Sequence, residues 1–138
     1  MKSGTGQPLG YLLHRVAAAL RAEVVATALE PIGLTFGEYI CMRMLSHSPG
    51  KSNADLARDA MVSPQAMNMV LRGLQDRGLI ARPATVASGR SLPAELTRQG
   101  LDVLKGVDPG IRQAERKLLA VLSDSDREHL RRILALLG

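Results

Sequence analysis

Three side chains that can each form paired hydrogen bonds recur at helical spacing, with an apolar thioether beside them: Gln65, Asn68, Arg72 and Met69. In the major groove of DNA, Gln and Asn can pair with adenine, Arg can pair with guanine, and an apolar group can contact the thymine methyl. These four positions share one face of a helix. The face therefore combines side chains suited to reading base pairs.

The opposite face of the same helix is apolar, so it can pack while the polar face meets solvent. Its residues are Met67, Val70, Leu71 and Leu74. An alternative is that any amphipathic surface helix has such a polar face without binding anything. Two observations favour nucleic acid: the four polar-face positions include no acid, and residues 60–94 carry four arginines against one acidic residue.

The start of this helix can also hold a phosphate. Ser63 and Pro64 have the order of an N-cap residue followed by a first-turn proline. The Ser63 hydroxyl and the free backbone N–H groups of the first turn are suitable donors to a phosphate oxygen.

A basic hairpin follows the helix. Residues 79–82 and the alternation of Leu92, Ala94 and Leu96 predict two short strands. The tip between them contains Ser88, Gly89, Arg90 and Ser91. An arginine at such a tip suits a narrow minor groove, where the negative potential is enhanced; the alternative is an ordinary solvated loop arginine.

Apolar periodicity and capping residues predict the helices that must position these side chains. Pro8 opens the first helix, and Thr35 with Glu38 has the capping-box pattern of the second. Asp108-Pro109-Gly110 is expected to kink or break the helix that Thr97 caps. The predicted helical ranges are 9–29, 36–46, 53–60, 64–76, 98–122 with that interruption, and 124–137.

The order of a helix, a helix, a short helix, a turn, a helix and a hairpin predicts a winged helix-turn-helix over residues 52–96. The first helix and the last two carry wide apolar stripes on either side of it. We interpret these stripes as dimer contacts, although a monomer could also fold them onto itself. A twofold dimer would place two recognition helices one DNA turn apart, about 34–36 Å.

An ordered set of motifs over nearly the whole chain resembles the MarR family of bacterial winged-helix regulators. The motifs are residues 34–39, Leu56-Ala57, residues 62–67, residues 74–80, Gly89-Arg90, residues 96–100 and Leu122-Ser123. The resemblance implies a homodimer on near-palindromic DNA, with the fourth helix in the major groove and the wing in the minor groove. It also implies control by a small effector, often an anionic phenolic compound.

One departure concerns the wing. Many family wings carry an acid beside the tip arginine, whereas residues 85–91 contain none. Either Ser88 or Ser91 orients Arg90 here, or that side chain is mobile.

We therefore predict a mainly α-helical single domain with a small two-stranded β wing. Residues 8–30 and 97–138 are the expected N- and C-terminal dimerisation helices, and residues 35–96 the winged helix-turn-helix. The predicted function is a sequence-specific DNA-binding transcriptional regulator, a repressor released by a small aromatic or anionic effector. Its operator is expected to be an inverted repeat in double-stranded DNA. The alternative is a winged-helix protein-interaction module that does not read DNA.

A second chemical pattern is found near the N-terminus. Tyr11 precedes Arg15 by one helical turn, and Tyr39 precedes Arg43 in the same way. An aromatic wall beside a guanidinium can hold an aromatic acid, with the arginine pairing its carboxylate. We take Tyr11, His14, Arg15, Tyr39 and Arg43 as effector-binding candidates. The alternative is that they are core aromatics and interface charges.

Composition excludes several other classes of function. The chain has 138 residues, a net charge of +5, one cysteine and three aromatic residues. Too few aromatics are present for a base-stacking RNA surface. No metal-ligand spacing, phosphate loop or nucleophile motif occurs, so no metal, cofactor or enzymatic activity is expected. The absence of a long apolar run or signal peptide predicts a cytoplasmic protein. Cys41 is expected to be a buried inert thiol, with a peroxide-reactive thiol as the alternative.

Overall fold

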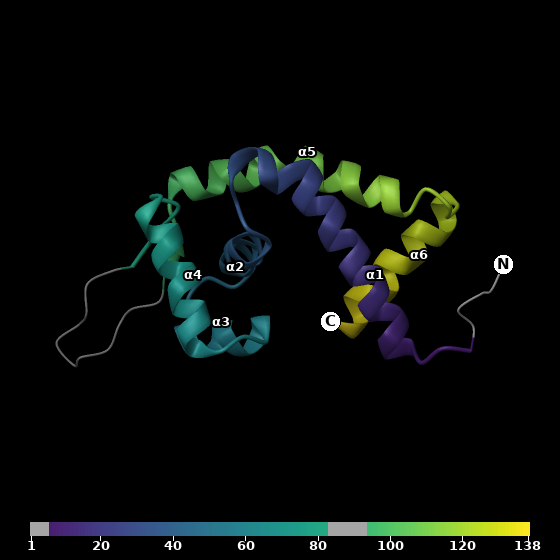
Figure 1. Cartoon of the computed structure of the whole chain (residues 1–138), viewed down its shortest axis with the longest axis horizontal. Helices are drawn as coiled ribbons and strands as arrows, with labels where there is room; N and C mark the ends of the chain where they lie inside the picture. The colour runs from purple at the N-terminus through teal and green to yellow at the C-terminus, as the bar shows by residue number, and fades with distance from the viewer. Residues whose placement is uncertain (1–5, 83–93) are drawn as a thin grey trace. The chain divides into compact units, whose positions relative to one another are not determined.

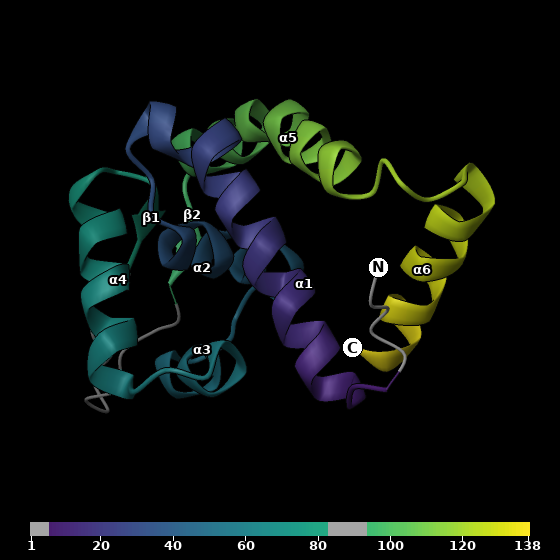
Figure 2. The ribbon, with the colours of Figure 1, turned by 45° about the vertical axis from the view of Figure 1, so that its right-hand side comes forward.

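The computed structural model describes residues 6–82 and 94–138, which fall into two compact units (Figures 1 and 2). The central unit is Leu29–Asp108, and the terminal unit joins the residues up to Ala28 with Pro109–Gly138. The chain passes from one unit to the other after Ala28 and again after Asp108. Each unit is described by itself below.

The central unit has the element order of a winged helix-turn-helix. Helices α2 (Phe36–His47), α3 (Asn53–Ala60) and α4 (Pro64–Asp76) pack on one another (Figure 2). Strands β1 (Ile80–Ala81) and β2 (Glu95–Leu96) follow as an antiparallel pair. Helix α5 (Arg98–Leu118) begins in this unit. The mainly α-helical fold class with a two-stranded wing is confirmed.

The residues just before α2 and α3 cap these helices with their side chains. Thr35 Oγ1 accepts a hydrogen bond from the Glu38 N–H at 3.0 Å, and Glu38 Oε1 accepts one from the Thr35 N–H at 2.9 Å. Ser52 Oγ accepts from the Asp55 N–H at 3.1 Å. Because such a cap satisfies a donor that has no partner inside the helix, each one stabilises the folded state by about 1 kcal/mol.

The core of the central unit lies between α2, α3, α4 and β1. Its largest fully buried side chains are Leu29, Cys41, Met42, Leu56, Leu71, Leu74 and Leu79. Apolar spacing in the sequence favours Phe36, Ile40 and Met44 as the inward face of α2, but these side chains are only half-buried, while Cys41, Met42 and Leu45 are buried. The helices and strand that pack against α2 decide which of its apolar faces turns inward, and spacing alone does not identify it.

The junction of β1 with α5 requires a glycine at position 100. A Cβ on Gly100 would lie 2.1 Å from the carbonyl oxygen of Leu79, so no larger residue fits without a backbone shift. Thr97 Oγ1 donates to the Gly78 carbonyl at 2.7 Å and accepts from the Gly100 N–H at 3.1 Å. These contacts fix the first turn of α5 against the base of the wing.

The terminal unit contains α1 (Leu9–Val24), the second half of α5 and α6 (Asp124–Leu137). After α1 the chain continues as a π-helical turn (Val25–Leu29) and a 3-10 turn (Glu30–Ile32). A Cβ on Gly110 would lie 2.8 Å from the Cβ of Ala28, so α5 approaches the end of α1 closely there. Lys117 Nζ and Glu23 Oε2 form an ion pair at 3.4 Å.

Of the predicted kink or break at Asp108–Gly110, the break does not occur, because α5 continues from Arg98 to Leu118 with Pro109 inside it. A proline removes one backbone hydrogen bond and crowds the preceding turn, at a cost of about 3 kcal/mol. Leu104 and Val107 are buried before it and Ala114 is buried after it. The burial of both halves of the helix opposes that cost, which spacing in the sequence does not reveal.

Within the described residues, no helix is both long and apolar enough to cross a membrane.

Candidate nucleic-acid interface

The exposed face of α4 matches the face predicted from the sequence. Gln65 and Arg72 are exposed, Asn68 is half-exposed and Met69 is 74% exposed. On the opposite face, Met67, Leu71 and Leu74 are buried, while Val70 is half-buried. The side chains that can bind bases therefore face solvent because the apolar half of α4 holds it against the core.

The start of α4 has the predicted geometry. Ser63 is extended, caps the helix by accepting from the Ala66 N–H at 3.0 Å, and precedes Pro64 as the first helical residue. Ser63 and Pro64 are exposed. The positive end of the helix dipole thus opens to solvent at the first turn of α4.

Some arginines near α4 already bond to other protein groups, whereas Arg72 bonds to none that the structure describes. Arg77 donates to the carbonyls of Ile32 and Gly33, and Arg58 pairs with Asp55. Among the described residues, the Gln65, Asn68 and Arg72 side chains have no hydrogen-bond or ion-pair partner. Arg72 is therefore the α4 guanidinium that a DNA ligand can reach without breaking an existing bond.

The wing begins as predicted and then leaves the described part of the chain. Strands β1 and β2 pair in the register Ile80 with Leu96 and Ala81 with Glu95. The predicted tip residues Ser88, Gly89, Arg90 and Ser91 lie outside the described residues.

The first tyrosine–arginine pair lies on α1 in the terminal unit. The Arg15 guanidinium carbon is 5.8 Å from the centroid of the Tyr11 ring, within the range of a cation–π contact. His14 is exposed on the same helix. The predicted one-turn spacing thus produces the expected contact.

The second pair lies on α2 in the central unit and includes an acid that the sequence did not indicate. Arg43 lies over the Tyr39 ring at 5.1 Å, donates to Tyr39 Oη at 3.3 Å and pairs with Asp108 Oδ1 at 2.9 Å. Burial alone would lower the pKa of Arg43, but its hydrogen bonds to Asp108 and Tyr39 outweigh that effect and raise the pKa. The five effector candidates therefore fall in two different units.

The sequence pattern described as the MarR family matches residues 34–92. A protein of Mycobacterium tuberculosis named HTH-type transcriptional repressor Rv2887 is 55% identical over 131 residues, which cover 95% of this chain and 94% of the relative. This chain belongs to the MarR family.

Solved structures agree with this membership. The MarR family protein Rv2887 of Mycobacterium tuberculosis in complex with salicylic acid has a TM-score of 0.81 and 54% identity, covering 95% of this chain and 96% of that chain. Its complex with DNA has a TM-score of 0.79 and 50% identity, covering 95% and 98%. The apo form of MarR from E. coli, at 18% identity and a TM-score of 0.82 over 94% and 96% of the chains, shares the fold.

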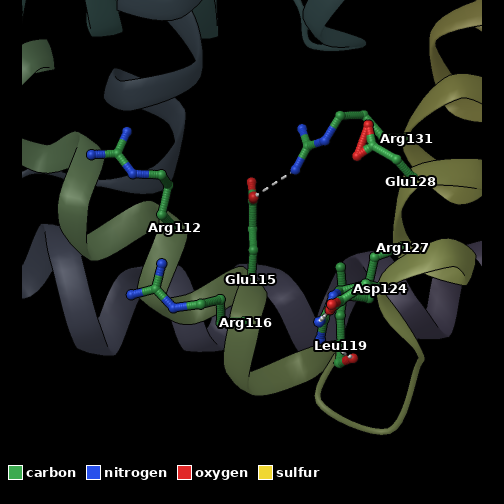
Figure 3. Close-up of a pocket in the computed structure, with 8 residues that line it drawn as sticks. All are labelled: Arg112, Glu115, Arg116, Leu119, Asp124, Arg127, Glu128 and Arg131. Carbon is green, nitrogen blue, oxygen red and sulfur yellow. Dashed lines mark hydrogen bonds and ion pairs between the residues drawn. The ribbon is translucent and has the colours of Figure 1, made fainter.

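The terminal unit of this MarR-family chain contains a charged pocket that sequence reasoning missed. Its volume is about 350 Å³, and α5 and α6 line it (Figure 3). Arg131 Nη2 reaches Glu115 Oε1 at 3.5 Å, and Arg127 pairs with Asp124. The sequence feature that could have indicated this pocket is a pair of arginines one helical turn apart on each of the two helices. The lining residues are Arg112, Glu115, Arg116, Leu119, Asp124, Arg127, Glu128 and Arg131.

A second, more apolar pocket of about 410 Å³ lies in the same unit. None of the five predicted effector residues is among the described residues that line either pocket. The apolar pocket is instead lined by both dimerisation segments expected from the MarR resemblance. Its lining is Val16, Leu20, Glu115, Leu118, Leu119, Arg127, Leu130, Arg131, Leu134 and Ala135.

The single cysteine of the chain is buried and free. Burial raises the pKa of the Cys41 thiol to about 11, because desolvation and the nearby Glu38 carboxylate outweigh the opposing charge of Arg82. At neutral pH only about one thiol in ten thousand is then ionised. This environment favours the inert thiol over the reactive one.

The described residues contain no group of three or more His, Cys, Asp or Glu side chains that could hold a metal ion. MarR-family regulators are generally not enzymes.

Proposed function

We propose that this chain is a homodimeric, sequence-specific DNA-binding transcriptional repressor that a small aromatic acid releases from its operator. The observation that carries the proposal is the solvent-facing side of α4, which presents unpartnered groups able to read bases. The relative Rv2887, named a transcriptional repressor and solved with DNA and with salicylic acid, supports repression, DNA binding and an aromatic-acid ligand.

In this function α4 lies in the major groove. Gln65 and Asn68 pair with adenine, Arg72 pairs with guanine and Met69 contacts a thymine methyl. Ser63 and the N–H groups that follow Pro64 hold a phosphate and so set the register of α4 along the duplex. Ser88, Gly89, Arg90 and Ser91 of the wing are assigned to the minor groove, which the Arg90 side chain enters, oriented by Ser88 or Ser91.

A homodimer accounts for the exposed apolar residues of α1 and α6. Helix α6 has no buried residue within the described chain, and Leu136 and Leu137 are each 76% exposed. A second copy would cover these side chains and the apolar pocket between α1, α5 and α6. Two copies related by twofold symmetry would then read an inverted repeat.

The effector is an aromatic acid whose carboxylate pairs with Arg15 or Arg43 and whose ring contacts the adjacent Tyr11 or Tyr39, with His14 nearby. Release from DNA is a population shift: the ligand binds more tightly to a dimer whose recognition helices no longer match one DNA turn. The p-aminosalicylic acid complex of Rv2887 supports the same ligand class. Because bacterial DNA lies in the cytoplasm, we place the protein there, and we assign it no catalytic residue.

The test begins with selection from random DNA duplexes at fixed salt. Enrichment of an inverted repeat with half-sites about one turn apart is the expected outcome. The affinity for this sequence should exceed that for random DNA by about a thousandfold or more. No enrichment, with only salt-sensitive weak binding, would instead support a winged-helix module that binds another protein.

The selected sequence allows a matched pair of variants. Replacing Arg72→Ala should weaken operator binding by about 1–3 kcal/mol and relax specificity at one base pair. The control Arg132→Ala removes the same charge from an exposed site on α6 and should leave operator affinity unchanged. Equal losses in both variants would mean that only total charge matters. Titration with salicylate should then lower operator affinity, and Arg15→Ala and Arg43→Ala identify which arginine binds it.

A further inference from the structure

Arg77 follows the last residue of α4 and connects that helix to a distant segment. Its Nη1 donates to the Gly33 carbonyl at 3.0 Å, and its Nη2 donates to the Ile32 carbonyl at 3.1 Å. Gly33 has a left-handed backbone with φ of +67° and ends the 3-10 turn. Since the last carbonyls of a helical turn have no partner inside it, the planar guanidinium satisfies two of them at once.

Glu38 completes the arrangement from α2. Its Oε1, which already caps α2 by accepting from the Thr35 N–H, lies 3.8 Å from Arg77 Nη1. A Cβ on Gly73, one turn before Arg77, would lie 3.3 Å from Glu38 Oε2. The carboxylate therefore rests against the last two turns of α4. We call Arg77, Glu38 and the Ile32–Gly33 carbonyls the α4 clamp.

The α4 clamp joins three parts of the central unit that bear on reading DNA. Ile32 and Gly33 belong to the segment through which the chain enters this unit after Ala28. Glu38 lies in the first turn of α2, and Arg77 ends the candidate recognition helix. Ser63 caps one end of α4, and the clamp holds the other end against α2.

We propose that Arg77 is a positioning residue for operator recognition, acting through the α4 clamp without contacting DNA. The inference rests on the proposed function and adds a residue that the base-reading face does not include. Both terminal nitrogens of Arg77 are already bound to protein, whereas Arg72, within α4, has no hydrogen-bond or ion-pair partner among the described residues. A helix that must place several side chains against base edges tolerates only small shifts, so a loosened end lowers specific affinity.

The main test is Arg77→Lys in the full-length dimer, measured on the selected operator and on random DNA. Lysine keeps the positive charge but has a single ammonium nitrogen in place of the planar two-nitrogen fork, so it cannot reproduce both bonds in the same geometry. We expect operator affinity to fall about tenfold, with random-DNA affinity and the salt dependence of binding unchanged. Thermal unfolding and circular dichroism at the assay temperature verify that the variant is folded.

A second variant, Glu38→Gln, tests the clamp from its other side. The amide oxygen can still accept from the Thr35 N–H, so the cap of α2 is kept while the charge facing Arg77 is lost. We expect a smaller loss of operator affinity, about threefold, again with an unchanged salt slope. Arg72→Ala is the comparison for a direct contact, and it should change base specificity at one position.

Two results would overturn the proposal. Full operator affinity in a folded Arg77→Lys variant would mean either that charge alone matters or that the clamp serves stability only. A salt slope lowered by about one in Arg77→Gln would show a direct phosphate contact. Failure of the proposed function looks different, because the unaltered chain would then bind no selected sequence.

Discussion

The central and terminal units differ in where their apolar side chains lie. All seven of the largest fully buried side chains found among the described residues belong to the central unit. In the terminal unit, α1 buries only Val24 and α6 buries none, as far as the described chain shows. Leu9, Leu136 and Leu137 are each more than three-quarters exposed. The central unit thus has its own core, whereas the terminal unit leaves apolar surface that a second copy can cover.

The largest effect is expected from a cavity in the central unit. Leu74 is fully buried on the inner face of α4, so Leu74→Ala should lower the free energy of unfolding by about 2–5 kcal/mol. Urea unfolding followed by circular dichroism measures this. The matched variant Leu136→Ala in the terminal unit should lower the free energy of unfolding much less, measured in protein dilute enough that a second copy does not cover this exposed side chain. Equal costs would contradict the contrast between the units.

A pH effect of similar size is expected from Cys41. Its thiol has a pKa of about 11 in the folded chain against an ordinary value of 9.0. Between these values the unfolded chain loses the proton first, so rising pH favours unfolding. The contribution is fully present below pH 9 and is lost by about pH 11, a change of about 3 kcal/mol. We expect the free energy of unfolding of the unaltered chain to fall across this pH range, and that of Cys41→Ala to fall less. If the two variants lose stability in parallel as the pH rises, water reaches the thiol.

A charge introduced into the lining of the apolar pocket in the terminal unit should weaken dimerisation. Leu134 is one of its lining residues, and Leu134→Asp should weaken dimerisation by about 2 kcal/mol or more. Analytical ultracentrifugation over a concentration series measures the shift toward monomer. The control Arg132→Asp introduces the same acidic side chain on α6 outside the lining of the apolar pocket, and this variant should remain a dimer. A variant Leu134→Asp that stays fully dimeric would assign the dimer contact to another surface.

The smallest effect is expected from replacing either of two serines that cap helices in the same way. Ser63 Oγ caps α4 at 3.0 Å, and Ser123 Oγ caps α6 at 3.1 Å. Either serine replaced by alanine should cost about 1 kcal/mol of stability. Only Ser63→Ala should also weaken operator binding, because that serine adjoins the proposed phosphate site. Equal operator affinity in the two variants would remove Ser63 from the interface.

Spacing within a few residues was enough to predict most of the local structure. The capping box at Thr35, the serine cap at Ser63 and the two faces of α4 all depend on residues within about two helical turns of one another. The same short range accounts for the tyrosine–arginine contacts on α1 and α2. The wing pair followed from the change to alternating apolar residues.

Contacts between distant segments were beyond this kind of prediction. The bonds of Arg77 to Ile32 and Gly33 span 45 and 44 residues, and the Arg43–Asp108 pair spans 65. From composition alone Arg77 counted among the basic residues of the DNA-binding region, although its guanidinium is bound to protein. The division of the effector candidates between two units likewise depends on how the chain folds.

The sequence by itself determined that a polar, acid-free face of α4 opposes an apolar one, because helical periodicity places every fourth residue on the same side. It also determined where the helices begin, because the caps are local hydrogen bonds. Only the tertiary structure decided that α5 continues through Pro109, which apolar face of α2 is buried and that Arg77 closes a clamp. In each case the free energy comes from packing or hydrogen bonding between segments far apart in the chain, which local preferences do not determine.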